Sequence, residues 1–166
     1  MKKFELTTEF ITNAFGKKLF RIKALIDFGD VKAGELGGYV EKEGNVSQDD
    51  NAWVRGDAKV YDNARVCGNA KVYGNALVYG NAKVCDNAEV YGNAWVRGDA
   101  RVCGNAEVYG NSWVRGDAKV YDNAWVSGDA KVYGDAKVSG NAKVHGNADY
   151  ALIQGFGTEF RCTTFY

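Results

Sequence analysis

A six-residue phrase repeats almost without interruption from Asn51 to Ala148, spelled Gly-Asn-Ala-Lys-Val-Tyr with small variations. Valine recurs at every sixth residue from Val54 to Val144, and the residue two positions before each of these valines is alanine except at Ser112. Self-similarity at a short fixed period is typical of solenoids, in which each repeat packs only on its neighbours. The repeat therefore limits the possible folds more than any other feature of the chain.

The residues that flank each valine follow a longer period of 18 residues. The position after the valine shows it in two series, Cys67, Cys85 and Cys103, and Tyr73, Tyr91 and Tyr109. A spacing of 12 mixes residue classes, because it pairs Arg65 with Leu77. One turn of the coil is therefore expected to contain three hexads.

Each hexad has the pattern of a short strand followed by a corner. Successive side chains of a strand point to opposite faces, so Ala-x-Val places alanine and valine on one side, which we predict to be the interior. The remaining pair is Gly-Asn, Gly-Asp or Asp-Asn, residue types that tolerate positive φ in tight turns. Three such units would close a triangular prism with three parallel sheets, and the lack of proline fits such continuous pairing.

The phrase Val-Tyr-Gly-Asn-Ala-Lys resembles the hexapeptide signature of left-handed parallel β-helices, and the left hand of the coil is implied by that resemblance alone. Residues Leu19 to Val31 (LFRIKALIDFGDV) and Gly34 to Val40 (GELGGYV) resemble the entry region of YdcK-like proteins, which are bacterial and phage-borne hexapeptide proteins. The resemblance covers most of the chain. It implies an all-β, single-stranded left-handed β-helix and no particular chemistry.

The sequence divides into three expected parts. Residues 1–48 form an N-terminal cap, with strand alternation from Leu19 to Phe28 and a turn at Gly37-Gly38. Residues 49–149 form the β-helix, and residues 150–166 form a C-terminal cap or a truncated extension with a strand from Phe160 to Tyr166. Caps are expected because the open ends of a solenoid expose unpaired strand edges.

Net charge argues against a general attraction to nucleic acid or membranes, and hydropathy argues against a membrane helix. Lysine and arginine total 21 and aspartate and glutamate total 21, so the chain has no net attraction to nucleic acid or to an anionic membrane. No apolar run reaches the length of a membrane helix, and the first residues lack the apolar stretch of a secretion signal. We expect a cytoplasmic protein without a membrane partner.

Function must lie on the outer walls, which we name face A, face B and face C after Val54, Val60 and Val66. Face B combines aromatic side chains with arginine, types that are enriched at protein interfaces. Its expected contact residues are Leu77, Tyr79, Trp95, Arg97, Trp113 and Arg115. We predict binding to a protein partner or to a second copy there; the alternative is that the aromatic ladders only stabilise the sheet.

Face C carries a column of five cations that would repel one another across the rungs. The column consists of Arg65, Lys83, Arg101, Lys119 and Lys137. It is a possible site for a polyanion or nucleic acid. The favoured alternative is local compensation, because Asp99, Asp117 and Asp135 each precede a member of the column by two residues.

Enzymatic function has little support. The hexapeptide fold includes acyltransferases, and the resemblance to them implies a trimer with a catalytic histidine, yet His145 is the only histidine. Glu89 and Glu107 are neighbouring carboxylates on an open wall, which offers no pocket to shift the pKa of either one. No Cys-x-x-Cys occurs, and collinear thiols cannot provide tetrahedral metal geometry, so we expect reduced cysteines, no metal site and no cofactor.

The sequence thus favours a non-enzymatic β-helical scaffold or protein-binding module that associates with itself through face B. If the chain is phage-borne, as the resemblance allows, it could bind and inhibit a host protein. Two alternatives stay open: a trimeric acyltransferase-like enzyme, and a polyanion-binding or nucleic-acid-binding protein that uses face C.

Overall fold

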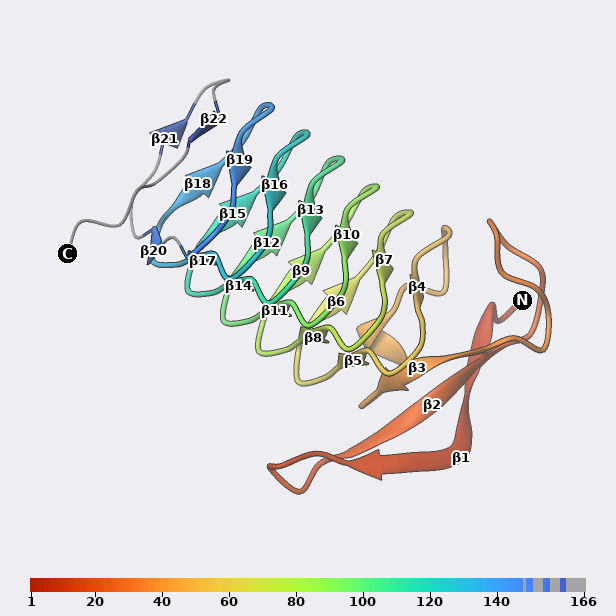
Figure 1. Cartoon of the computed structure of the whole chain (residues 1–166). Coiled ribbons are helices and arrows are strands. Elements are labelled where there is room, and N and C mark those ends of the chain that lie inside the picture. The colour runs from red at the N-terminus through yellow and green to blue at the C-terminus, as the bar shows by residue number, and fades with distance from the viewer. Residues whose placement is uncertain (148, 151–153, 156–158, 161–166) are drawn as a thin grey trace.

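The computed structural model describes residues 1–147, 149–150, 154–155 and 159–160. The hexads wind into a three-walled solenoid of stacked turns, and an antiparallel hairpin extends from its N-terminal end (Figure 1). The expected turn of 18 residues is confirmed by the strand registers, in which Val60 pairs with Val78 and Val96 pairs with Val114. The fold is an all-β solenoid with three parallel sheets.

Each wall is a sheet built from two-residue strands of successive turns. Face A is formed by β4 (Trp53–Val54), β7 (Lys71–Val72), β10 (Glu89–Val90), β13 (Glu107–Val108), β16 (Trp125–Val126), β19 (Lys143–Val144) and β22 (Glu159–Phe160). Face B is formed by β5 (Lys59–Val60), β8 (Leu77–Val78), β11 (Trp95–Val96), β14 (Trp113–Val114), β17 (Lys131–Val132) and β20 (Asp149–Tyr150). Face C is formed by β6 (Arg65–Val66), β9 (Lys83–Val84), β12 (Arg101–Val102), β15 (Lys119–Val120), β18 (Lys137–Val138) and β21 (Gln154–Gly155).

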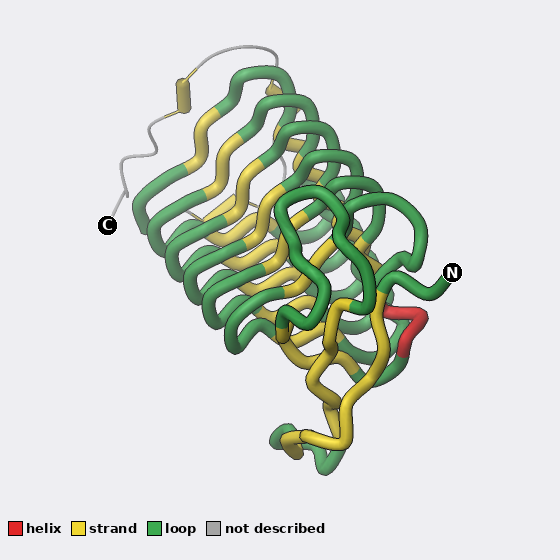
Figure 2. Tube along the Cα trace, turned by 90° about the vertical axis from the view of Figure 1, so that its right-hand side faces the viewer, coloured by secondary structure: helices red, strands yellow, loops and turns green. Residues whose placement is uncertain are grey.

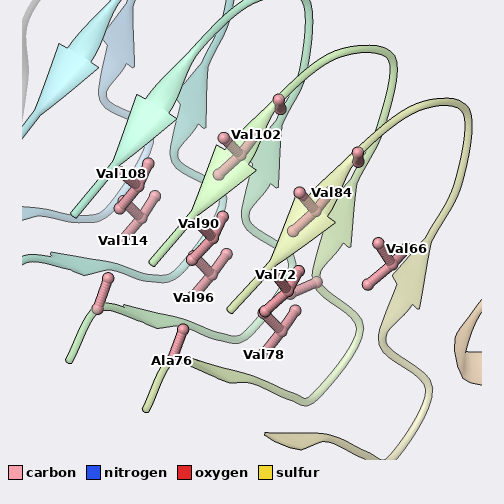
Figure 3. Close-up of a cluster of buried hydrophobic side chains, with 14 of the residues drawn as sticks. Val66, Val72, Ala76, Val78, Val84, Val90, Val96, Val102, Val108 and Val114 are labelled. Atoms are coloured by element: carbon pink, nitrogen blue, oxygen red, sulfur yellow. The ribbon is translucent and has the colours of Figure 1, made fainter. Parts of the chain in front are cut away.

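The interior contains the alanines and valines, as the alternation predicts. Every alanine and valine of these positions from Ala52 to Val144 is at most 2 % exposed. Figure 3 shows the valines of the three walls directed into one narrow core, with Val66, Val84 and Val102 in successive turns. Ser112 replaces an alanine without leaving an unpaired hydroxyl, because its Oγ donates to the carbonyl oxygen of Tyr109 at 2.8 Å.

The corners are two-residue turns whose first residue lies in the left-handed region. Glycine occupies most of these positions, and Asp62, Asp86 and Asp122 have φ between 59° and 62°. Their carboxylates accept a hydrogen bond from the backbone N–H one turn later, as Asp86 Oδ2 does from Gly104 at 3.0 Å. The tube view of Figure 2 shows these corners aligned in rows along the solenoid.

An amide ladder follows the corner between face C and face A. In each step the Nδ2 atom of one asparagine donates to the Oδ1 atom of the asparagine one turn later, at 2.9–3.2 Å. The ladder contains Asn51, Asn69, Asn87, Asn105, Asn123 and Asn141. The corner asparagines therefore link turns to one another in addition to shaping each turn.

The N-terminal cap contains more regular structure than the sequence indicated. Strands β1 (Phe4–Thr12) and β2 (Lys18–Ala24) form an antiparallel hairpin, and β2 pairs with β3 (Leu36–Val40). The expected strand from Leu19 to Phe28 is thus confirmed only as far as Ala24, and β1 was not predicted. A 3₁₀ helix, η1 (Glu43–Asn45), follows β3.

The predicted turn at Gly37-Gly38 is wrong, because both glycines lie inside β3. A Cβ atom at Gly37 would lie 2.5 Å from Ile22 Cγ1 and 2.6 Å from the Val54 carbonyl oxygen. One at Gly38 would lie 2.7 Å from the carbonyl oxygen of Ala58. The glycines are needed because β3 crosses closely over the end of the core, not because the chain reverses there.

The parallel pairing of the solenoid begins within the segment expected to be cap. Val40 pairs with Val60, and Val46 forms a parallel bridge with Val66. At the other end the pairing continues beyond the hexads, since Tyr150 pairs with Val132 and Phe160 pairs with Val144. The strand expected over residues 160–166 lies outside the described residues except for Phe160.

Candidate protein-binding and anion-binding faces

The pairing registers place the outward residues in the columns that the period of 18 predicts. On face B, Leu77 pairs with Trp95, and Trp95 pairs with Trp113. On face C, a continuous series of registers joins Arg65, Lys83, Arg101, Lys119 and Lys137. Residues far apart in sequence are thus neighbours because each turn repeats the geometry of the one before it.

The aromatic side chains of face B stack between turns. The Trp95 and Trp113 rings lie parallel, with centroids 4.9 Å apart and planes 1° apart. Tyr61 and Tyr79 stack in the same way at 4.9 Å. Each tryptophan is half-buried, and its ring presents a flat apolar surface along the wall.

The two arginines of face B lie over neighbouring rings instead of extending into solvent. The Arg97 guanidinium carbon is 5.9 Å from the centroid of the Trp113 ring, and that of Arg115 is 4.9 Å from the Tyr133 ring. The Nε atom of Arg115 is buried and has no hydrogen-bond partner among the described residues. These contacts hold the cations in place on the aromatic surface.

The chain's own hairpin covers the first part of this aromatic surface. Leu19 of β2 is fully buried against Tyr39 and Tyr61, and Ile11 and Tyr79 pack against the same cluster. Tyr61 is only 5 % exposed, and this burial raises the pKa of its hydroxyl to about 12. The cluster ends at Tyr79, whereas the aromatic columns continue along face B.

The cations of face C lack the compensation that the sequence favoured. In the described part of the chain, no ion pair within 4 Å joins Asp99, Asp117 or Asp135 to the basic column. The three aspartates instead line one groove together with Arg101, Lys119 and Lys137. The expected direct ion pairs are therefore not found among the described residues, and Asp99 instead accepts a hydrogen bond from the Nδ2 atom of Asn81 at 2.9 Å.

Face A is a network of paired polar groups. The hydroxyl of Tyr73 donates to Glu89 at 2.8 Å, and that of Tyr91 donates to Glu107 at 2.9 Å. Burial raises the pKa of both tyrosine hydroxyls, and the hydrogen bond to the carboxylate raises it further. The adjacent glutamates therefore act as acceptors in a stacked ladder, where the three tyrosine rings repeat at 4.8 and 4.9 Å.

A hollow on face A near the cap is lined by Arg55, Lys71, Tyr73 and Glu89. Its cations are already paired with the loop that precedes β3. Arg55 contacts Asp30 at 2.8 Å and Glu35 at 3.1 Å, and Lys71 contacts Asp30 at 3.3 Å. The hydrogen bond from Arg55 lowers the pKa of Asp30. This network fastens the cap to face A.

The single histidine and the cysteines lie in regular hexads. His145 is exposed on face A, and no corner between Asn51 and Asn147 in the described residues is lengthened into a loop. Cys67, Cys85 and Cys103 are free thiols aligned on face C and partly buried. The alignment predicted for the three cysteines is confirmed by the β6–β9 and β9–β12 registers, while Cys162 lies outside the described residues.

The regular hexads are also what the comparison with protein families recognises. The model for the YdcK beta solenoid repeat matches residues 70–84 and 100–116. These two segments are similar to the YdcK beta solenoid repeat. The matched YdcK segments include Leu77 and Tyr79 of face B in the first and Trp113 and Arg115 in the second. These four candidate contact residues therefore belong to segments that match the repeat, while Trp95 and Arg97 lie between the two matched segments.

Comparison with curated proteins gave no match for the chain. Within the described residues, no helix of the structure has the length and apolar character needed to cross a bilayer.

Proposed function

We propose that the protein is a β-solenoid binding module that associates with a second copy of itself through face B. The observation that carries this proposal is the continuity of the aromatic surface. Leu19 and Ile11 of the chain's own hairpin cover it at Tyr61 and Tyr79, and it then continues over Leu77, Trp95 and Trp113. A surface that already accepts apolar side chains from a β-hairpin is suited to accept them from another chain.

Face B is a rigid contact surface, which lowers the entropic cost of binding. The stacked tryptophans and the arginines over the rings are held in place before binding, so little side-chain entropy is lost when a partner covers them. Aromatic and arginine side chains also dominate the binding energy of measured interfaces. Two copies related by a twofold axis would bury the same residues from each side, which doubles the contribution of every contact.

The test compares oligomeric state in a matched pair of variants, by size-exclusion chromatography with light scattering. Trp95→Asp combined with Trp113→Asp places two carboxylates on face B and is expected to give monomers, whereas the wild type gives dimers. Trp125→Asp is the control, because Trp125 occupies the same position of the hexad on face A and is 38 % exposed. A monomeric wild type, or dimers that persist in the face B variant, would overturn the proposal.

Anion binding through face C is a second candidate. It is favoured by five aligned cations that, among the residues the structure describes, form no ion pair with the neighbouring aspartates. We expect weak binding of a polyanion such as heparin that falls steeply with salt. Lys83→Glu combined with Lys119→Glu should abolish it, while Lys59→Glu combined with Lys131→Glu on face B should not. Absence of binding at low salt would exclude this candidate.

We propose no catalytic role for His145, since no corner in the described residues up to Asn147 is lengthened. Binding of acetyl-coenzyme A that is lost in His145→Ala would favour the acyltransferase alternative instead. We propose a cytoplasmic location, because free thiols at Cys67, Cys85 and Cys103 fit a reducing compartment. If the protein is encoded by a phage and inhibits a host protein, we propose that it binds the host protein through the same face B.

A further inference from the structure

Two thiols and a carboxylate converge on face C, beside the basic column. Cys85 and Cys103 follow the paired strands β9 and β12, so their side chains lie on adjacent turns. Asp86 occupies the corner after Cys85. The Sγ atoms of both cysteines and a carboxylate oxygen of Asp86 all lie within 4.8 Å of one another.

The backbone conformation of Asp86 explains why its carboxylate reaches both turns. Asp86 has φ of 60°, and its Oδ2 atom accepts a hydrogen bond from Gly104 N–H at 3.0 Å, one turn later. Gly104 follows Cys103 directly. The carboxylate is therefore held beside the second thiol, away from the line that joins the two sulfur atoms.

The sequence argued against a metal site because the three cysteines are collinear. The position of the Asp86 carboxylate removes this objection. Three thiols in a line cannot surround a cation, but two thiols and a carboxylate at the side form a triangle. Metal–sulfur bonds of about 2.3 Å require sulfur atoms about 3.8 Å apart for tetrahedral geometry and about 4.6 Å apart for linear geometry. Both separations are compatible with the two sulfur atoms, which lie within 4.8 Å of each other.

This arrangement occurs once in the thiol column. The residue after Cys67 is Gly68 and the residue after Cys103 is Gly104, so only Cys85 is followed by an acidic corner. Asp122 has the same conformation and donor, with Gly140 N–H at 3.0 Å, but its turn contains Tyr121 and the next contains Ser139. Asp122 is thus a natural control for Asp86.

We propose that Cys85, Asp86 and Cys103 bind one thiophilic divalent cation of the Zn²⁺ type, with solvent at the remaining position. Two thiolates and one carboxylate match the ligand preference of such cations, which lack a redox step of their own. Binding replaces two thiol protons by one metal ion, so two protons are released to solvent and no electrons are exchanged. Lys83 and Arg101 lie in the adjacent column and offset the remaining negative charge of the site.

The protonation state of the free site makes proton release measurable. Burial raises the pKa of the Cys85 thiol to about 12. Burial and the charge of Asp86 also raise the pKa of the Cys103 thiol, against a smaller opposite effect of the hydrogen bond with Cys85. A cysteine thiol has an ordinary pKa of about 8.5, so metal binding at pH 7 displaces protons from the two thiols.

The experiment is titration of the full chain with Zn²⁺ by calorimetry at pH 7 in two buffers of different ionisation enthalpy, with a phosphine reductant. Cd²⁺ is titrated in parallel, and thiolate-to-metal charge-transfer absorption is recorded. All proteins carry Cys162→Ser, which removes the thiol outside the described residues. We expect one ion per chain and release of about two protons.

Three variants of the proposed ligands and two control variants locate the site. Cys85→Ser and Cys103→Ser are expected to lose the charge-transfer band and to weaken binding by about 100-fold or more, and Asp86→Asn by about tenfold. The asparagine side chain of Asp86→Asn retains an oxygen acceptor for Gly104 and tolerates the left-handed backbone, so the turn is preserved. Asp122→Asn and Cys67→Ser are expected to bind like the parent.

Three results would overturn the proposal. They are absence of binding at millimolar Zn²⁺, binding that survives Cys85→Ser, and an equal loss in Cys67→Ser together with no loss in Asp86→Asn. The last pattern would indicate a site between Cys67 and Cys85 that does not use the corner carboxylate.

Discussion

The ammonium group of Lys3 donates a hydrogen bond to the carbonyl oxygen of Ala52 at 2.9 Å, although 49 residues separate the two in sequence. The same group also donates to the carbonyl oxygens of Asp49 and Asp50 at 3.2 and 3.3 Å. Lys3 is only 2 % exposed, and its Nζ atom lies 4.8 Å from the centroid of the Phe28 ring. One buried lysine thus satisfies three carbonyls where the first turn of the solenoid begins.

Replacing this lysine should destabilise the fold. Lys3→Met keeps most of the side-chain volume but leaves three carbonyl groups without their donor, so the free energy of unfolding should fall by about 1–3 kcal/mol. Urea denaturation would measure it. Lys2→Met is the control, because Lys2 is exposed and pairs with Glu43 at the surface, where an ion pair contributes about 0–1 kcal/mol. Equal losses in the two variants would contradict the structural role of Lys3.

Lys3 also predicts a pH dependence of stability. Burial lowers the pKa of Lys3 to about 8, against the opposing effects of Asp50 and Asp49, whereas the unfolded chain has the ordinary value of 10.5. Between these values the unfolded state holds more protons, so the free energy of unfolding of the wild type rises with pH relative to Lys3→Met. Below about pH 8 the difference in free energy of unfolding between the wild type and Lys3→Met should not change with pH. A difference that falls between pH 8 and 10 would show that the sign is wrong.

The extended glycines of β3 predict a steric effect in the cap. Gly37→Ala would place a methyl group 2.5 Å from Ile22 Cγ1 and 2.6 Å from the Val54 carbonyl oxygen, so we expect a loss of about 1–3 kcal/mol. Gly44→Ala in η1 is the matched control, since a Cβ atom there meets no atom within 4 Å. Thermal unfolding of both variants provides the comparison. A neutral Gly37→Ala would mean that β3 does not cross the core as closely as described.

The amide ladder predicts a cost for removing a single corner side chain. Asn105→Ala breaks the hydrogen bonds from Asn87 and to Asn123, each 3.0 Å long, and should cost about 1 kcal/mol or slightly more. Asp117→Ala removes a side chain from another corner that makes no hydrogen bond within the described residues. Chemical denaturation should show a smaller effect for Asp117→Ala. Equal losses of stability in the two variants would show that the corner asparagines act only by shaping the turns and not through the ladder hydrogen bonds.

The repeats of this chain were predictable because they are periodic. Once Val54 and Val72 are known to occupy equivalent positions, the partner of every repeat residue is the one 18 positions away. The columns of face B and face C, including Trp95 beside Trp113, follow from counting. The left-handed sense does not follow from the period and was an expectation from resemblance.

The cap was less predictable because its contacts have no period. Two adjacent glycines usually indicate a turn, and nothing local in Gly37-Gly38 shows that β3 passes over Trp53 and Val54. The hairpin strand β1 contributes Phe4 to the core through pairing with Ala24, a contact that only the assembled end of the solenoid creates. The expected ion pairs between the corner aspartates and the basic column failed for a related reason, since spacing along the sequence does not fix the direction of a side chain.

The amino-acid sequence by itself determined a three-walled coil, its valine and alanine core and the composition of each outer column, because side-chain alternation and an 18-residue period leave one arrangement for the repeats. Only the tertiary structure decided where carboxylates point, how the hairpin covers the aromatic surface and which corner lies beside two thiols. Those features depend on the left-handed backbone of Asp86 and on contacts between segments such as Lys3 and Ala52. Such contacts form only when the turns are stacked and the end of the core is closed.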